Sequence, residues 1–233
     1  MAREVKIGNK WVGDDHPVYI VAEIGINHNG DIGIAEDLIK AGKHAGVDAV
    51  KFQKRTPELC VPPEQRNQMR ETPWGYITYL EYRYKVEFNE TEYDEIDRYA
   101  REVGIDWFAS VWDEPSVDFL EKYNPIAYKV PSASLTDFNL LRHLRSTGRP
   151  IILSTGMSTL NQIESAVSLI GEDNLVITHA TSAYPCDPNE LNLRMIQTLR
   201  EMFTCPIGYS GHEVGLVTSA VAVGLGACMV ERH

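Results

Sequence analysis

Eight short apolar runs, separated by stretches with helical spacing, constrain the fold of this chain more than any other feature. The apolar runs are residues 18–24, 47–52, 105–111, 126–130, 150–153, 175–180, 206–209 and 227–230. The helical stretches between them are residues 34–45, 90–103, 114–123, 138–146, 160–170, 190–202 and 215–225. Such alternation predicts repeated βα units around a parallel sheet. Eight strands and seven helices predict an α/β fold, a TIM (β/α)₈ barrel truncated at the end of its eighth strand.

Two segments depart from this repeat. Residues 4–13 have the pattern of a short hairpin, with Gly8 and Asn9 at the turn. We therefore expect an N-terminal hairpin over residues 1–16 that caps the barrel, and a barrel domain over residues 17–233. Residues 54–88 interrupt the second βα unit with a segment rich in proline, arginine and aromatic residues. Loops of this length are commonly lids or disordered segments.

Composition limits the classes of function. A chain of 233 residues that is 43% hydrophobic can bury the core of one large domain. Its net charge of −11 argues against a nucleic-acid partner, so an anionic substrate must be captured by a few local cations. There is no apolar run of membrane-spanning length and no leader pattern, and the four cysteines lack zinc or disulfide spacing. We expect a cytoplasmic protein with no membrane contact.

Polar side chains recur where the apolar runs stop. The active site of a (β/α)₈ barrel lies at the carboxyl ends of its strands, so these residues are the candidates for the site. They are Glu23, Lys51, Gln53, Ser110, Lys129, Ser132, Ser154, Ser182, Tyr184, Ser210, His212, Glu231 and His233.

Two of the candidates are lysines, which are costly to bury alone. Lys51 and Lys129 stand at strand ends beside several hydroxyls and Gly156. This combination favours a site for a phosphate and a carboxylate. The alternative is that each ammonium extends to the rim of the barrel or pairs with a glutamate.

Two more candidates are histidines that follow successive strands. Ser210 and His212 share one face of their strand, and Glu231 and His233 share one face of the next. Neighbouring strands lie about 5 Å apart, so the two imidazoles could reach one ion. Neutral imidazoles suit a divalent transition metal. Two protein ligands leave the remaining positions of such an ion to water or substrate.

The sequence leaves several roles open. Glu23 could be a general base, an acceptor for a sugar hydroxyl, or the ion-pair partner of a lysine. Tyr184 could donate its hydroxyl or simply line the rim. His28, between two asparagines, could line the site or belong to a helix cap. His179 and Cys186 have no partner in the sequence pattern and are expected to be structural.

A set of motifs in chain order carries a family resemblance. These are AEIGINHNG (22–30), VKFQ (50–53), YKVPSAS (128–134), LSTGMS (153–158), TSAYP (181–185), GYSGHE (208–213) and ERH (231–233). Together they resemble the sialic acid synthase family, which includes N-acetylneuraminate synthase and its legionaminic and pseudaminic acid synthase relatives. Members condense phosphoenolpyruvate with an amino-sugar aldehyde. The motifs run from the first strand to the eighth.

The resemblance implies a TIM barrel followed by an antifreeze-like domain, which we expect to be absent from this chain, and a homodimer for the full-length protein. It implies a phosphoenolpyruvate shell of Lys51, Lys129, Ser110, Ser132, Ser154, Ser182 and Ser210. It implies an acceptor-sugar side of Glu23, Gln53, Tyr184 and Glu231. His212 and His233 would hold Mn²⁺, with Mg²⁺ or Co²⁺ as alternatives.

The function predicted from the resemblance is condensation of phosphoenolpyruvate with an open-chain N-acetylmannosamine-type sugar, giving a nonulosonic acid and phosphate. That reaction belongs to the transferases that form carbon–carbon bonds, and Glu23, Lys51, Lys129, Tyr184 and Glu231 are its expected catalytic groups. Synthesis of legionaminic or pseudaminic acid is the near alternative. A metal-dependent hydrolase and a barrel that only binds or assembles are the alternatives from other classes.

Overall fold

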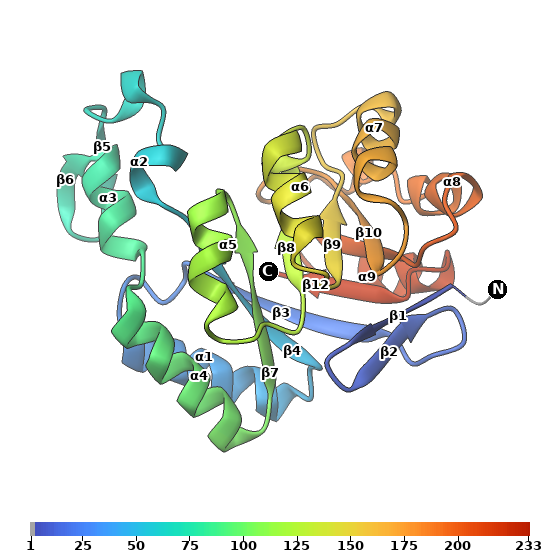
Figure 1. Cartoon of the computed structure of the whole chain (residues 1–233), viewed down its shortest axis with the longest axis horizontal. Helices are drawn as coiled ribbons and strands as arrows, with labels where there is room; N and C mark the ends of the chain where they lie inside the picture. Colours follow the sequence, from blue (N-terminus) through green and yellow to red (C-terminus); the bar gives the residue numbers. More distant parts are fainter. Residues whose placement is uncertain (1–2) are drawn as a thin grey trace.

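A closed barrel of eight parallel strands forms the centre of the computed structural model, which describes residues 3–233 (Figure 1). The strands in order are β3 (Tyr19–Gly25), β4 (Ala49–Lys54), β7 (Asp106–Val111), β8 (Tyr128–Val130), β9 (Ile151–Ser154), β10 (Leu175–Ala180), β11 (Ile207–Gly211) and β12 (Met229–Arg232). β12 pairs in parallel with β3 and so closes the barrel, with Val230 opposite Ile20. The predicted barrel is confirmed.

Seven helices follow the first seven strands and cover the outside of the barrel. They are α1 (Ile32–Ala45), α4 (Glu90–Val103), α5 (Glu114–Glu121), α6 (Phe138–Ser146), α7 (Leu160–Ile170), α8 (Met195–Met202) and α9 (Val217–Gly224). α1 shows how the sequence sets their bounds. The Asp31 carboxylate accepts from the amides of Gly33 and Ile34 at its start, and Gly46 ends it with a left-handed φ of 79°.

The sixth predicted helix, residues 190–202, is shorter in the structure than in the prediction. Its first residues instead form the 3₁₀ turn η3 (Pro188–Glu190) and an irregular link to α8. Asn192 in that link has a φ of 43°, a left-handed conformation that a right-handed helix cannot continue through. The apolar spacing alone did not reveal this break.

The predicted N-terminal hairpin is present and covers the amino ends of the barrel strands. β1 (Glu4–Ile7) and β2 (Lys10–Gly13) pair antiparallel across a turn where Gly8 has a φ of 57°. Val5, Ile7 and Val12 of the hairpin belong to one buried cluster with inward-facing barrel residues such as Phe108. The hairpin thus closes one end of the barrel with apolar packing and leaves the other end for polar groups.

Residues 54–88 form an ordered excursion beside the barrel, at the upper left of Figure 1. It contains α2 (Pro57–Cys60), the 3₁₀ turn η1 (Pro63–Gln65), the hairpin of β5 (Met69–Thr72) and β6 (Gly75–Thr78), and α3 (Tyr79–Val86). Thr78 and Glu81 form a capping box at the start of α3. The disordered alternative for this segment is therefore wrong.

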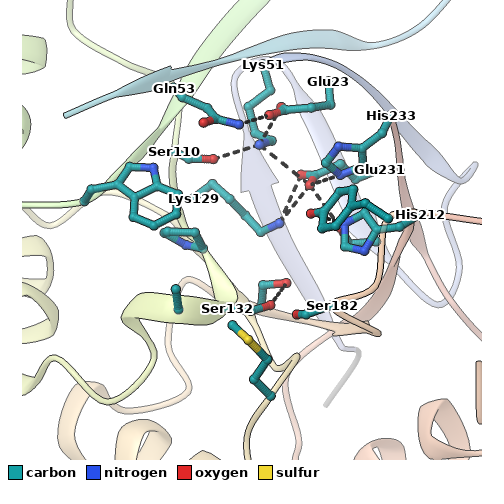
Figure 2. Close-up of a pocket in the computed structure, with 17 residues that line it drawn as sticks. Glu23, Lys51, Gln53, Ser110, Lys129, Ser132, Ser182, His212, Glu231 and His233 are labelled. Carbon is teal, nitrogen blue, oxygen red and sulfur yellow. Dashed lines mark hydrogen bonds and ion pairs between the residues drawn. The ribbon is translucent and has the colours of Figure 1, made fainter. Parts of the chain in front are cut away.

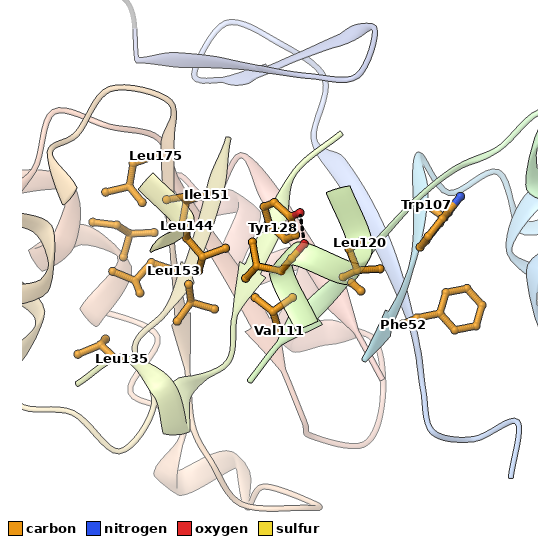
Figure 3. Close-up of a cluster of buried hydrophobic side chains, with 14 of the residues drawn as sticks. Phe52, Trp107, Val111, Leu120, Tyr128, Leu135, Leu144, Ile151, Leu153 and Leu175 are labelled. Atoms are coloured by element: carbon orange, nitrogen blue, oxygen red, sulfur yellow. Dashed lines mark hydrogen bonds between the residues drawn. The ribbon is translucent and has the colours of Figure 1, made fainter. Parts of the chain in front are cut away.

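The outward faces of the strands pack against the helices. Tyr128 on β8, Leu144 on α6 and Leu153 on β9 are fully buried in this layer, and Figure 3 shows them among the other side chains of the cluster. The four cysteines are unpaired, as their spacing predicted. None of the helices within residues 3–233 is long and apolar enough to cross a membrane.

Candidate active site

One pocket lies at the carboxyl ends of the barrel strands, and it gathers every candidate residue predicted from the sequence (Figure 2). Its lining comprises Glu23, Lys51, Gln53, Ser110, Trp112, Lys129, Pro131, Ser132, Ala133, Ser154, Met157, Ser182, Tyr184, Ser210, His212, Glu231 and His233. Alternation along each strand produces this convergence, because residues two apart point to the same face. The common location is established, whereas the individual roles of these residues remain predictions.

Four charged side chains in the pocket pair with one another. Lys51 Nζ lies 2.5 Å from Glu23 Oε2 and 3.7 Å from Glu231 Oε1, and it donates to Ser110 Oγ at 2.7 Å. Lys129 Nζ donates to both carboxylate oxygens of Glu231, at 3.0 and 3.1 Å. None of the four is more than 7% exposed. The structure thus shows the alternative in which each lysine pairs with a glutamate.

Mutual pairing sets the protonation of this cluster. Burial alone would raise the pKa of Glu231, but the neighbouring ammonium groups of Lys129 and Lys51 hold it well below its usual value. Burial opposes charge on Lys51 too, yet Glu23 and Glu231 raise its pKa above the ordinary value. The pKa of Lys129 is lowered by burial, against the attraction of Glu231. The two lysines and the two glutamates thus form two ion pairs of opposite formal charge inside the pocket.

The two histidines lie side by side at the rim of the pocket. The ring centroids of His212 and His233 are 4.4 Å apart. His212 Nδ1 lies 2.5 Å from the Thr181 carbonyl oxygen, a partner that assigns the proton to Nδ1. Nε2 then carries a lone pair, and it accepts from the Tyr184 hydroxyl at 2.6 Å. Burial lowers the pKa of His212 to about 4, so the ring is neutral at pH 7.

These imidazoles fit a divalent transition metal. A metal-binding histidine characteristically donates its second N–H to a carbonyl, and His212 does so to Thr181. In the part of the chain that the structure describes, no three His, Cys, Asp or Glu side chains are grouped to hold an ion. Two protein nitrogens would therefore hold such a metal, with water or substrate in the other positions.

Three serines and a glycine form a hydroxyl corner in the same pocket. Ser132 Oγ donates to Ser154 Oγ at 3.1 Å and accepts from the Gly156 amide at 3.0 Å. A Cβ at position 156 would sit 2.7 Å from Ser132 Oγ and closer still to Ser182 Oγ. Only glycine leaves room for these hydroxyls to converge, and such donors suit a phosphate or a carboxylate.

Three further residues considered from the sequence lie elsewhere. His28 is buried, stacks on Phe88 with 3.9 Å between ring centroids, and does not line the pocket. The cap of the following helix is Asp31, so neither suggested role of the asparagine-flanked histidine holds. His179 Nε2 lies 2.7 Å from the Leu191 carbonyl, and Cys186 is buried, as expected for structural residues.

Sequence reasoning missed two large side chains of the lining. Trp112 follows the last residue of β7, and Met157 follows Gly156. Met157 has a φ of 60° and is 70% exposed at the rim. The signal was available, because both residues stand just past strand ends. Neither residue was predicted, because an apolar side chain at a strand end does not differ from an ordinary packing residue.

The fold and the pocket define a (β/α)₈-barrel protein with a buried, charge-balanced site at the strand ends. The family model described as "NeuB family" matches residues 38–233. The chain belongs to the NeuB family.

Named relatives agree with this assignment. The chain is 39% identical over 229 residues to human N-acetylneuraminate-9-phosphate synthase, and the match covers 96% of this chain and 64% of that relative. It is 35% identical over 235 residues to N,N'-diacetyllegionaminic acid synthase of Legionella pneumophila, covering 97% and 66%. The chain thus spans about two thirds of the length of the curated relatives it matches.

A solved structure supports the fold over the whole chain. The N-acetylneuraminic acid synthetase of Leptospira borgpetersenii, solved in complex with citrate, superposes with a TM-score of 0.91 at 29% identity. The superposition covers 100% of this chain and 79% of that one. The resemblance to the sialic acid synthases is confirmed.

Proposed function

We propose that the chain is the catalytic barrel of a nonulosonic acid synthase, which condenses phosphoenolpyruvate with an open-chain amino sugar. The observation that carries the proposal is one shared pocket that holds two buried lysines, two neighbouring imidazoles and a hydroxyl corner. The names of the human and Legionella relatives support the class of product. N-acetylmannosamine is the proposed type of acceptor, and the diacetamido sugars of legionaminic and pseudaminic acid are the alternatives.

Phosphoenolpyruvate would lie against the lysines and the hydroxyls. Its carboxylate and phosphate would take ammonium donors from Lys51 and Lys129, in competition with Glu23 and Glu231. The hydroxyls proposed to complete this shell are those of Ser110, Ser132, Ser154, Ser182 and Ser210. Hydrogen bonds between ionised partners are the strongest that such a site can offer.

The charge balance of the pocket argues for a cation beside this anion. Lys51, Lys129, Glu23 and Glu231 sum to zero, so a bound phosphoenolpyruvate would bring uncompensated negative charge into a buried place. A divalent cation on His212 and His233 would offset that charge, and we propose Mn²⁺, with Mg²⁺ or Co²⁺ as alternatives. When bound, such an ion supplies Lewis acidity towards the aldehyde oxygen of the sugar.

The reaction forms one carbon–carbon bond. The methylene carbon of phosphoenolpyruvate joins the aldehyde carbon of the sugar, water adds to the former enol carbon, and the bond from that carbon to the phosphate oxygen breaks. The products are the nonulosonic acid and phosphate. The lysines and hydroxyls hold the donor in attack geometry, and positioning of this kind can supply roughly 7–11 kcal/mol. The side chains that would face the acceptor are those of Glu23, Gln53, Tyr184 and Glu231. The two glutamates would accept hydrogen bonds from sugar hydroxyls, or protons from the reacting groups.

The same family resemblance leads us to propose a homodimer in the cytoplasm for the longer protein. Sedimentation of the protein at its full length would measure the oligomeric state directly.

Turnover with defined acceptors tests the proposed function. Purified protein with Mn²⁺ and phosphoenolpyruvate is given N-acetylmannosamine, its 6-phosphate or a diacetamido hexose, and phosphate and new acid are followed by colorimetry and mass spectrometry. We expect phosphate release with at least one acceptor and none with the Lys129→Met variant. Absence of phosphate with every acceptor, or hydrolysis of a substrate without phosphoenolpyruvate, would overturn the proposal.

A further inference from the structure

The Gln53 side chain bridges the pocket and a buried arginine behind it. Gln53 Nε2 donates to Glu23 Oε1 at 2.8 Å, and Gln53 Oε1 accepts from Arg55 Nη2. A guanidinium offers only donors and an ionised carboxylate only acceptors. A single orientation of the amide therefore satisfies both neighbours, and Arg55 fixes which end of Gln53 faces the pocket.

Arg55 is buried but does not line the pocket. It is 2% exposed, and its guanidinium carbon lies 4.8 Å from the Trp112 ring centroid. Its Nε has no hydrogen-bond partner among residues 3–233, and the nearest carboxylate oxygen, Glu87 Oε2, is 3.7 Å away. Burying a guanidinium with pairing this loose costs free energy, so packing alone does not account for it.

The base of the excursion at residues 54–88 holds Arg55 in place. Glu87 Oε1 accepts from the Arg55 amide at 2.9 Å and from Lys54 Nζ at 3.2 Å. Lys54 Nζ also donates to the Phe88 carbonyl at 2.8 Å. These contacts hold the first and last residues of the excursion against each other. From this position the Arg55 side chain contacts Gln53.

We propose that Arg55 is a positioning residue for the acceptor side of the pocket, acting through Gln53. The inference rests on the proposed function for its substrate, a hydroxylated sugar. With its carbonyl held by Arg55, Gln53 keeps its NH₂ group at Glu23 and has a second N–H left for an oxygen of the acceptor. A flipped amide would set its carbonyl against the Glu23 carboxylate and remove that donor.

Side-chain amide NMR tests the orientation without any turnover. The chain has five glutamines, so selective ¹⁵N-glutamine labelling gives five NH₂ pairs, and Gln53→Ala assigns one of them by its loss. In Arg55→Met we expect the Gln53 pair to shift and exchange faster with solvent, while the other four stay in place. Arg149→Met is the matched control, because it removes a guanidinium that pairs with Glu121 outside the pocket. An unchanged Gln53 pair in Arg55→Met would overturn the proposal.

Kinetics then test the consequence for the acceptor. Loss of a charge-assisted hydrogen bond predicts that Arg55→Met raises the acceptor KM about tenfold, with the KM of phosphoenolpyruvate unchanged. In a Gln53→Ala background the same substitution should add nothing, and Arg55→Lys should recover part of the loss. Equal effects in both backgrounds would show that Arg55 acts elsewhere. An inactive unmodified protein would refute the proposed function, while the NMR result would still decide the role of Arg55.

Discussion

The two levels of the barrel interior differ sharply, although the same strands build both. At the level next to the N-terminal hairpin, the inward side chains are apolar and include Val21, Ala49, Phe108, Ile152 and Met229. Two residues further along the same strands, the inward side chains are Glu23, Lys51, Ser110, Ser154 and Glu231. A step of two residues is only about 6.6 Å along a strand.

The contrast teaches that stability and chemistry are separated by level within one fold. The apolar level is sealed by the hairpin and contributes burial of hydrophobic surface. The polar level holds buried charges that are tolerable only because each ammonium has a carboxylate partner. Substitutions at the two levels should therefore lower stability for different reasons, a lost apolar contact at one level and an unpaired charge at the other.

The largest effect on stability is expected at the apolar level. Phe108→Ala should lower the free energy of unfolding by about 3–5 kcal/mol, because the ring is fully buried and its loss leaves a cavity. Urea denaturation measures the change, and calorimetry of phosphoenolpyruvate on the folded fraction should find its affinity kept. A loss of stability below about 1 kcal/mol would mean that the side chains of the apolar level are not tightly packed around Phe108.

A somewhat smaller loss is expected when a charge at the polar level loses its partner. Lys129→Met removes the nearer of the two ammonium groups beside Glu231, leaving Lys51 at 3.7 Å, and should cost about 3 kcal/mol. The double variant Lys129→Met with Glu231→Leu removes both charges and should regain most of that stability, since it extends the apolar level upwards. Urea denaturation of the single and the double variant compares their free energies of unfolding. Equal values would contradict the claim that the unpaired carboxylate of Glu231 causes the loss.

Binding of a divalent metal at the histidines of the pocket rim should raise the stability of the folded chain. At Mn²⁺ one hundred times above the dissociation constant, a single site stabilises the folded chain by about 2.7 kcal/mol. We expect this gain from thermal unfolding of the unmodified chain and of His143→Ala, a control at an exposed ion pair with Asp118. His212→Ala should show none of it, and a retained shift in that variant would place the metal elsewhere.

The smallest expected effect is a pH dependence from His28, which is buried against Phe88 outside the pocket. Burial lowers the pKa of His28 to about 4, from an ordinary value near 6.5. Between these values the unfolded chain binds a proton that the folded chain does not, so stability falls as the pH falls. From pH 7 to pH 5, the unmodified chain should lose about 1–2 kcal/mol more than His28→Asn, as measured by urea denaturation. Parallel losses in both proteins would show that His28 titrates normally.

Periodicity made most of this fold predictable. The helices at residues 90–103, 138–146 and 160–170 have the predicted bounds, because apolar spacing and caps agree there. The pocket lining was predictable for a related reason, since parallel strands bring their carboxyl ends to one edge. The hairpin of β5 and β6 was not, because its exposed strands carry little apolar alternation.

Pairing within the site could not be predicted from the sequence. Lys129 and Glu231 are separated by 102 positions, and nothing near either residue indicates its partner. Arg55 lies beside the VKFQ motif yet was not chosen, because a charge one position beyond a strand resembles a solvated loop residue. Only the three-dimensional arrangement shows that it is buried and that it contacts Gln53.

Calorimetric titration of phosphoenolpyruvate, with saturating Mn²⁺ or with chelator, tests the central claim most directly. If the lysines take the anion and the histidines take the cation in one charge-balanced pocket, each ligand must tighten the binding of the other by the same factor. We predict tight binding with Mn²⁺, much weaker binding with chelator, and none in Lys129→Met. Binding that is absent, or equally strong with and without the metal, would contradict the account.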